Sequence, residues 1–200
     1  MFRLNLLPGD LEAAREAIKV SSIANHGKWD GSEEKQAIGL AAQVRVAQEF
    51  YPNTCLEDYL KPGFDGGFDI PICDHKIDVK TAIRDFCDPK PHYLAGVIDF
   101  QKDHPCTDYI FTSYNKKTSM LTVCGWITKK EFFATAIFYA RGDKFHLDSG
   151  FSKEVPHDCW LAEYGDLKNL YSSRMMREVF EGVENKDEAC DRQARLSDFV

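Results

Sequence analysis

The chain has 200 residues, of which 44% are hydrophobic and 12% aromatic, and its formal net charge is −7. This length and composition suit one domain with a substantial core. The acidic balance gives no bulk-charge signal of a nucleic-acid binder, although a local basic strip or a bound metal can outweigh net charge near a site.

The sequence also lacks the usual targeting segments. The apolar run at the N-terminus is too short for a secretory signal. No stretch approaches the roughly 18 apolar residues that a membrane span needs. We therefore expect a cytoplasmic protein with no membrane partner.

Two helices are predicted in the first quarter of the chain. Residues 11–23 have a helical composition, with Asp10 as the N-cap. Residues 32–51 give the stronger prediction, because their apolar side chains recur at helical spacing and Pro52 ends the pattern. The apolar positions of this second helix are Ala37, Leu40, Ala41, Val44, Ala47 and Tyr51.

Extended runs rich in β-branched and aromatic residues follow these helices. The first two are joined by a short turn at residues 74–75, so they predict a β-hairpin. The extended runs cover residues 68–72, 76–83, 93–100, 108–113 and 120–127.

The last part of the chain is predicted to contain two further helices. Thr128 is the expected N-cap of a helix over residues 129–140, which Gly142 ends. Residues 166–180 are the second. We expect residues 1–180 to form one domain, followed by an acidic, solvated tail over residues 181–200.

Two carboxylates and one ammonium group are predicted to meet at one edge of the hairpin. Asp78 and Lys80 share a face of the second strand, because alternate side chains of a strand point to opposite faces, and Asp69 begins the partner strand. Carboxylate oxygens hold Mg²⁺. A nearby lysine can activate a water or stabilise charge on a reacting phosphate. Asp suits a strand interior poorly, so Asp78 inside an apolar run favours a functional role.

Each of these residues also has a structural interpretation. Asp78 and Lys80 could form an exposed ion pair, which contributes little to stability. Asp69 could be a turn residue after the glycines at 66–67, and Asp65 is an alternative first carboxylate.

Asp69, Asp78 and Lys80 resemble the active-site motif of the PD-(D/E)xK nucleases, the restriction-endonuclease-like superfamily. Phe68 stands where that family often has Pro. The predicted order of a helix, several strands and a helix over about residues 32–140 is also similar to the family core. The resemblance implies an α/β fold with a three-layer restriction-endonuclease-like core, in which helices flank a mixed central sheet.

The resemblance further implies a metal-dependent nuclease that hydrolyses phosphodiester bonds in DNA, as an endonuclease. Asp69, Asp78 and the Val79 carbonyl would hold Mg²⁺, for which Mn²⁺ could substitute, and Lys80 would position or deprotonate the attacking water. Two alternatives stay open. One is a structure-specific endonuclease similar to the Holliday-junction resolvases, which act as homodimers. The other is an inactive nucleic-acid-binding protein of the same fold.

A further ligand is expected from the helix over residues 32–51. Gln43 lies where the family usually has a Glu that completes the metal site. Glu33 and Glu34 are the alternatives, but acids in the first turn of a helix also complement its dipole. An amide oxygen attracts a divalent cation less than a carboxylate does.

The middle of the chain is locally basic, and its lysines are candidate contacts for a phosphate backbone. They could equally be the solvated side of a hairpin and of a helix start. These residues are Lys116, Lys117, Lys129 and Lys130.

Overall fold

The computed structural model describes residues 1–20, 32–59, 67–72, 74–146 and 152–170. Within these ranges the chain is a mixed α/β protein with three α-helices, α1 (Pro8–Val20), α2 (Glu33–Ala47) and α3 (Lys129–Thr135). The 3₁₀ helices are η2 (Leu56–Tyr59), η3 (Asp99–Asp103) and η4 (Tyr164–Asp166). The strands are β1 (Phe2–Asn5), β2 (Ile70–Ile72), β3 (His75–Arg84), β4 (Leu94–Ile98), β5 (Asp108–Asn115), β6 (Met120–Thr128), β7 (Ile137–Tyr139), β8 (Lys144–His146), β9 (Ser152–Glu154) and β10 (Cys159–Glu163).

The central sheet has five strands in the order β1-β6-β5-β3-β2. It is mixed, because β3 and β5 are parallel while the other neighbours are antiparallel. The parallel pair runs in register from Ile77 opposite Asp108 to Arg84 opposite Asn115. Strand β2 is short and covers only the first residues of β3, so the rest of that edge of β3 extends beyond β2.

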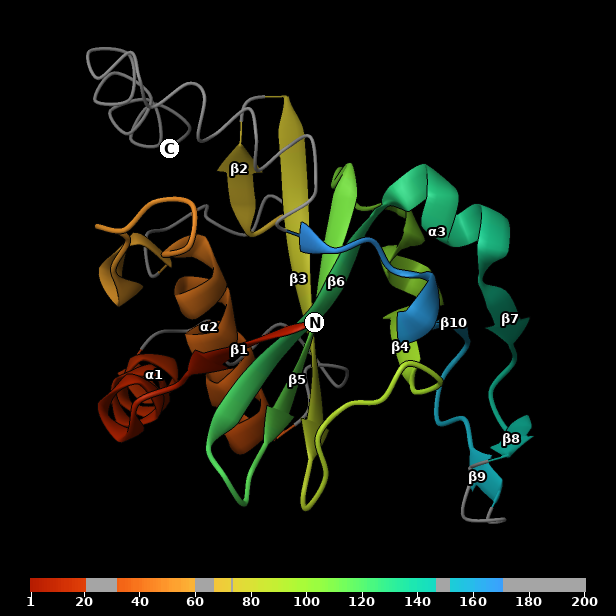
Figure 1. Cartoon of the computed structure of the whole chain (residues 1–200), viewed down its shortest axis with the longest axis horizontal. Helices are drawn as coiled ribbons and strands as arrows, with labels where there is room; N and C mark the ends of the chain where they lie inside the picture. The colour runs from red at the N-terminus through yellow and green to blue at the C-terminus, as the bar shows by residue number, and fades with distance from the viewer. Residues whose placement is uncertain (21–31, 60–66, 73, 147–151, 171–200) are drawn as a thin grey trace.

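Different elements cover the two faces of the sheet (Figure 1). Helices α1 and α2 pack on one face, where Ile77, Val79 and Ile110 are buried with them. Helix α3 and a smaller sheet, in the order β4-β10-β7, lie at the other face over Tyr109 and Phe111. The side-chain alternation of β3 and β5 therefore sends neighbouring residues into two separate cores.

Several predicted elements are confirmed. The hairpin is present as β2 and β3, and strands β4, β5 and β6 occupy the predicted extended runs. Thr128 caps α3, since its side chain accepts from the Glu131 N–H while the Glu131 carboxylate accepts from the Thr128 N–H. This reciprocal pair is a capping box, which satisfies two N–H groups that the first helical turn leaves unpaired.

Other predicted boundaries are wrong. Helix α3 ends at Thr135, because Ala136 is extended and residues 137–139 pair with β10 as β7. Helix α2 begins after Ser32, whose side chain accepts from the Lys35 N–H, and it ends at Ala47. Asp10 lies inside the first turn of α1, where its carboxylate accepts from the Leu7 N–H.

The chain ends also differ from the prediction. Strand β1, which pairs with β6, was not predicted. Residues 167–169 of the expected C-terminal helix are not helical, and they connect to the central sheet through a bridge between Trp126 and Lys168. The rest of that helix and the acidic tail lie outside the described residues. None of the described helices is long and apolar enough to cross a membrane.

Residues 167–168 pack closely on β6 at Gly125, and a substitution there tests this packing. A Cβ at Gly125 would lie 2.6 Å from Leu167 Cβ and 2.7 Å from the Lys168 carbonyl oxygen. We expect Gly125→Ala to lose about 1–3 kcal/mol, because two backbone segments would have to separate. Gly39→Ala is the matched control, because nothing lies within 4 Å of its Cβ and alanine is favoured inside a helix. Thermal unfolding that shows no difference between the two variants would contradict this packing.

Candidate active site

Asp69 immediately precedes β2, at the point where the edge of β3 continues beyond that short strand. Its N–H donates to the Ile77 carbonyl at 2.7 Å, and its carboxylate accepts from the Val79 N–H at 2.7 Å. Ile70 pairs with Ile77, so the same register continued by one residue sets Asp69 opposite Asp78. Two backbone contacts thus fix the carboxyl group of Asp69 at this edge.

Asp78 and Lys80 lie on the same face of β3, as the alternation predicts. The Lys80 ammonium is 2.7 Å from Asp78 Oδ2, and the Asp78 residue is only 5% exposed. Ile77 and Val79 point to the opposite face and are buried in the core that α2 covers. The structure therefore brings together Asp69, Asp78 and Lys80 as neighbours.

The pKa of the Asp69 carboxyl group is strongly perturbed by its surroundings. Burial raises the pKa of the Asp69 carboxyl well above its usual range, and the nearby charge of Asp78 raises it further. The Lys80 ammonium and the Val79 N–H act in the opposite direction but do not cancel the effect. Asp69 and Asp78 also lie within hydrogen-bonding reach of each other. Such a pair is most stable with a proton or a cation between its members.

Tyr109 and Cys106 line the same side of the sheet. Tyr109 is fully buried, and its hydroxyl lies beside the Cys106 thiol without a hydrogen bond of normal geometry in the described chain. Burial raises the pKa of both groups, and the charge of Asp78 contributes to each shift. A buried hydroxyl without a hydrogen-bond partner of normal geometry is uncommon in folded proteins.

The donor set fits a hard divalent cation. Mg²⁺ is commonly held by one or two carboxylates and keeps several waters, and Asp69 and Asp78 supply the carboxylates. The Val79 carbonyl points to the same edge as the Val79 N–H that reaches Asp69, because both groups of a strand residue share one edge. Within the described ranges no group of three or more His, Cys, Asp and Glu side chains is placed to hold a metal. Because Mg²⁺ commonly keeps several waters, we expect waters among the remaining ligands.

Within the described ranges, no hydrogen bond or ion pair joins the helical residues predicted to complete the site to Asp69 or Asp78. Gln43 belongs to α2, which packs on the opposite face of the sheet, and no hydrogen bond joins it to Asp69 in the described chain. Glu33 and Glu34 are exposed at the start of α2, and Glu34 is 3.7 Å from the Lys116 ammonium. A metal-binding role for any of these three residues stays a prediction.

The four predicted DNA-contacting lysines form two separate pairs. Lys116 and Lys117 precede β6, and Lys129 and Lys130 follow it, so the length of a nine-residue strand, about 30 Å, separates them. Lys116 is paired with Glu34 and with Asp85, at 3.7 and 3.5 Å. Lys129 donates to the His104 carbonyl, and its charge acts on Cys106 together with those of Asp78 and Lys80. Of the four lysines, Lys129 is thus the one whose charge acts on a group that Asp78 and Lys80 also influence.

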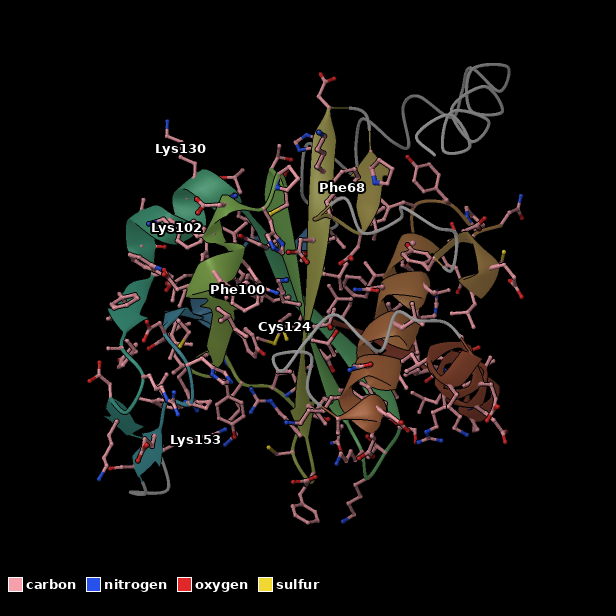
Figure 2. The ribbon with its side chains drawn as sticks, turned by 180° about the vertical axis from the view of Figure 1, so that it is seen from behind. Phe68, Phe100, Lys102, Cys124, Lys130 and Lys153 are labelled. Atoms are coloured by element: carbon pink, nitrogen blue, oxygen red, sulfur yellow. The ribbon has the colours of Figure 1, made fainter. Side chains whose placement is uncertain are left out.

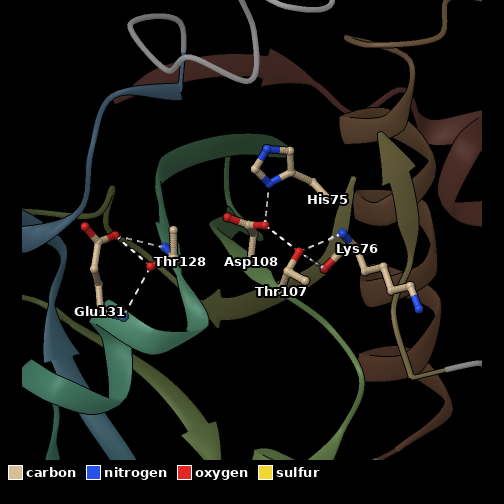
Figure 3. A network of polar contacts seen from close by, with 6 residues as sticks. All are labelled: His75, Lys76, Thr107, Asp108, Thr128 and Glu131. Atoms are coloured by element: carbon tan, nitrogen blue, oxygen red, sulfur yellow. Dashed lines mark hydrogen bonds and ion pairs between the residues drawn. The ribbon is translucent and has the colours of Figure 1, made fainter. Parts of the chain in front are cut away.

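A second polar cluster was not predicted from the sequence (Figure 3). The His75 Nδ1 lies 2.7 Å from Asp108 Oδ2, and the Thr107 hydroxyl donates to the same oxygen at 2.6 Å. Asp108 is buried, while His75 lies at the surface end of β3. The sequence suggested only a hairpin turn at His75, because its partner is 33 residues away and no local pattern marks a contact of that range.

No protein-family model matches the chain, and no curated protein or solved structure is detectably similar to it. The chemistry of the site therefore rests on its own residues.

Asp69→Asn should stabilise the metal-free protein at neutral pH. A carboxyl whose pKa is higher in the folded chain favours folding most below its unfolded pKa, and this contribution disappears as pH rises through the folded pKa. Asparagine keeps the oxygen that accepts from Val79 but carries no charge. We expect a rise of a few degrees in Tm at pH 7 with chelator present, and a smaller rise near pH 4.

Asp74→Asn is the control for this experiment, because Asp74 is an exposed turn residue. Equal Tm changes in the two variants, or a loss of stability in Asp69→Asn at neutral pH, would contradict the raised pKa of the Asp69 carboxyl.

Proposed function

We propose that the protein is a Mg²⁺-dependent nuclease that hydrolyses phosphodiester bonds in DNA. One observation carries the proposal: two carboxyl groups, one of them with a pKa raised by burial and by the other's charge, meet at a strand edge beside a lysine 2.7 Å from one of them. Strongly perturbed ionisable groups that converge in this way are more common at functional sites than elsewhere.

Each residue has a distinct role in this proposal. Asp69, Asp78 and the Val79 carbonyl would hold the cation, which when bound lowers the pKa of water and stabilises charge on phosphate oxygens. The Lys80 ammonium is partly exposed, so it can donate a hydrogen bond to the phosphate or orient the attacking water. In the reaction a water oxygen bonds to phosphorus, a phosphorus–oxygen ester bond breaks, and the leaving oxygen takes a proton.

The architecture is compatible with the restriction-endonuclease-like core that the motif suggests. A mixed sheet lies between helices on its two faces, and the hairpin β2–β3 carries the carboxylates. The chain departs from that core by its second sheet and by Gln43, which belongs to a helix on the far face. Because of these departures, membership of the restriction-endonuclease-like superfamily is itself part of the proposal.

DNA would approach over the start of α3. The charge of Lys129 acts on the Cys106 thiol, as the charges of Asp78 and Lys80 also do. Lys130 follows Lys129 in the chain and is exposed. We therefore favour this pair over Lys116 and Lys117 as phosphate contacts.

An inactive nucleic-acid-binding protein is the second candidate. The Lys80 ammonium is paired with Asp78, so the chain itself compensates one of the charges that would attract a cation. In that case Mg²⁺ would leave the Tm of the protein unchanged, and no DNA would be cleaved with or without Mg²⁺.

Lys80→Ala should reduce Mg²⁺-dependent cleavage by about 100-fold or more, because a residue that transfers or positions a proton typically contributes that much. Cleavage is measured on plasmid, linear and four-way-junction DNA, so that general and structure-specific endonucleases are distinguished. Lys153→Ala is the matched control, since Lys153 is an exposed lysine on β9. Cleavage by Lys80→Ala at the rate of the unmodified protein, in preparations that give equal Tm, would overturn the catalytic role.

A further inference from the structure

A cavity of about 310 Å³ opens outside the carboxyl site. One side of the cavity is formed by the end of β4 and the start of η3. The other side is formed by the loops that precede β8 and β10. A volume of this size is at the lower end of the range found for small-ligand sites. Its walls are Ile98, Asp99, Phe100, Arg141, His157 and Asp158.

One wall of the cavity is aromatic. Phe100 is 52% exposed, although it is a large apolar side chain, and Ile98 lies next to it in the chain. Figure 2 shows Phe100 and Lys102 projecting from the same short helix, η3. An exposed aromatic face next to a cavity offers a stacking surface for a planar ring.

Two of the polar walls are carboxylates held in place by other groups. Asp99 Oδ1 accepts from the Trp160 indole N–H at 2.7 Å, and Asp158 Oδ1 accepts from the Arg141 N–H at 2.7 Å. The Asp99 N–H also donates to the Asp158 carbonyl at 2.9 Å. Each carboxylate thus keeps one oxygen that accepts no hydrogen bond from the described chain. The cavity presents fixed acceptors beside a stacking surface.

Cations lie at the margin of this cavity. Arg141 is exposed and lines it, and its guanidinium forms no ion pair within the described ranges. The Lys102 ammonium lies 4.7 Å from the centre of the Trp160 ring, whose N–H binds Asp99. The two carboxylates would repel a phosphate, whereas Arg141 and Lys102 would attract one. A ligand with a neutral ring and an attached phosphate matches this distribution of charge.

We propose that the cavity binds one unpaired nucleobase of the DNA substrate, and that guanine fits it best. Guanine presents two adjacent N–H donors, at N1 and N2, for the two carboxylate oxygens that remain, one on Asp99 and one on Asp158, while thymine presents its single N–H between two carbonyl oxygens. The ring stacks on Phe100, and the phosphate meets Arg141. This inference rests on the proposed nuclease function and narrows the substrate to DNA with an unpaired or single-stranded guanine.

Calorimetric titration of the full chain with single nucleotides tests the base site. We expect GMP to bind about tenfold or more tightly than IMP, which lacks the N2 amine, and than TMP. Phe100→Ala should weaken GMP binding by about fivefold or more, since stacking on an aromatic ring contributes at least that much. Asp158→Asn should remove the preference for GMP over IMP, because asparagine keeps one acceptor for the Arg141 N–H but loses the charge.

Phe86→Ala is the matched control, because Phe86 is an 82% exposed phenylalanine that does not line the cavity. Equal affinities for GMP, IMP and TMP, or equal GMP binding by the Phe100 and Phe86 variants, would overturn the base site. The two proposals fail separately. If Lys80→Ala loses cleavage but Phe100→Ala does not change GMP binding, only the base site is rejected. GMP binding that depends on Phe100, with no cleavage of any DNA, sinks only the nuclease.

Discussion

The close approach of the Asp69 and Asp78 carboxyl groups is the interaction on which the site depends. Two backbone contacts hold Asp69 opposite Asp78, and the parallel pairing of β3 with β5 fixes Asp78 from the other side. Like charges brought together in a buried place oppose folding. Lys80 offsets part of this cost, and the apolar core behind Ile77 and Val79 supplies the stability that tolerates the rest. A bound cation would relieve the repulsion that remains.

Local patterns in the sequence predicted the local parts of this arrangement. The hairpin, the shared face of Asp78 and Lys80, and the Thr128 cap follow from residues a few positions apart, and all three are present. Contacts between distant segments were not predictable in this way. The pairing of β1 with β6, the β4-β10-β7 sheet and the contact of His75 with Asp108 each join residues far apart in sequence. The end of α3 was misplaced for the same reason, because β7 forms only when β10 is available to pair with it.

The smaller sheet would add the proposed base site to a face that otherwise only covers the core. Strand β10 carries Trp160, whose ring packs against Phe133 and whose N–H orients Asp99 at the rim of the cavity. The start of α3, which provides Lys129, lies over the same face of the central sheet. Cleavage chemistry at β3 and base recognition at η3 would thus use elements that the same core holds in place.

Diffraction from crystals soaked in Mn²⁺ tests the central claim most directly, because the anomalous signal of the ion locates it without assumptions about activity. We expect one strong peak between the carboxyl groups of Asp69 and Asp78, with the Val79 carbonyl in reach and waters as the other ligands. This peak should be lost in crystals of Asp78→Asn. A fully occupied ion at another place, with the Asp69 and Asp78 pair left without one, would contradict a metal site at this strand edge.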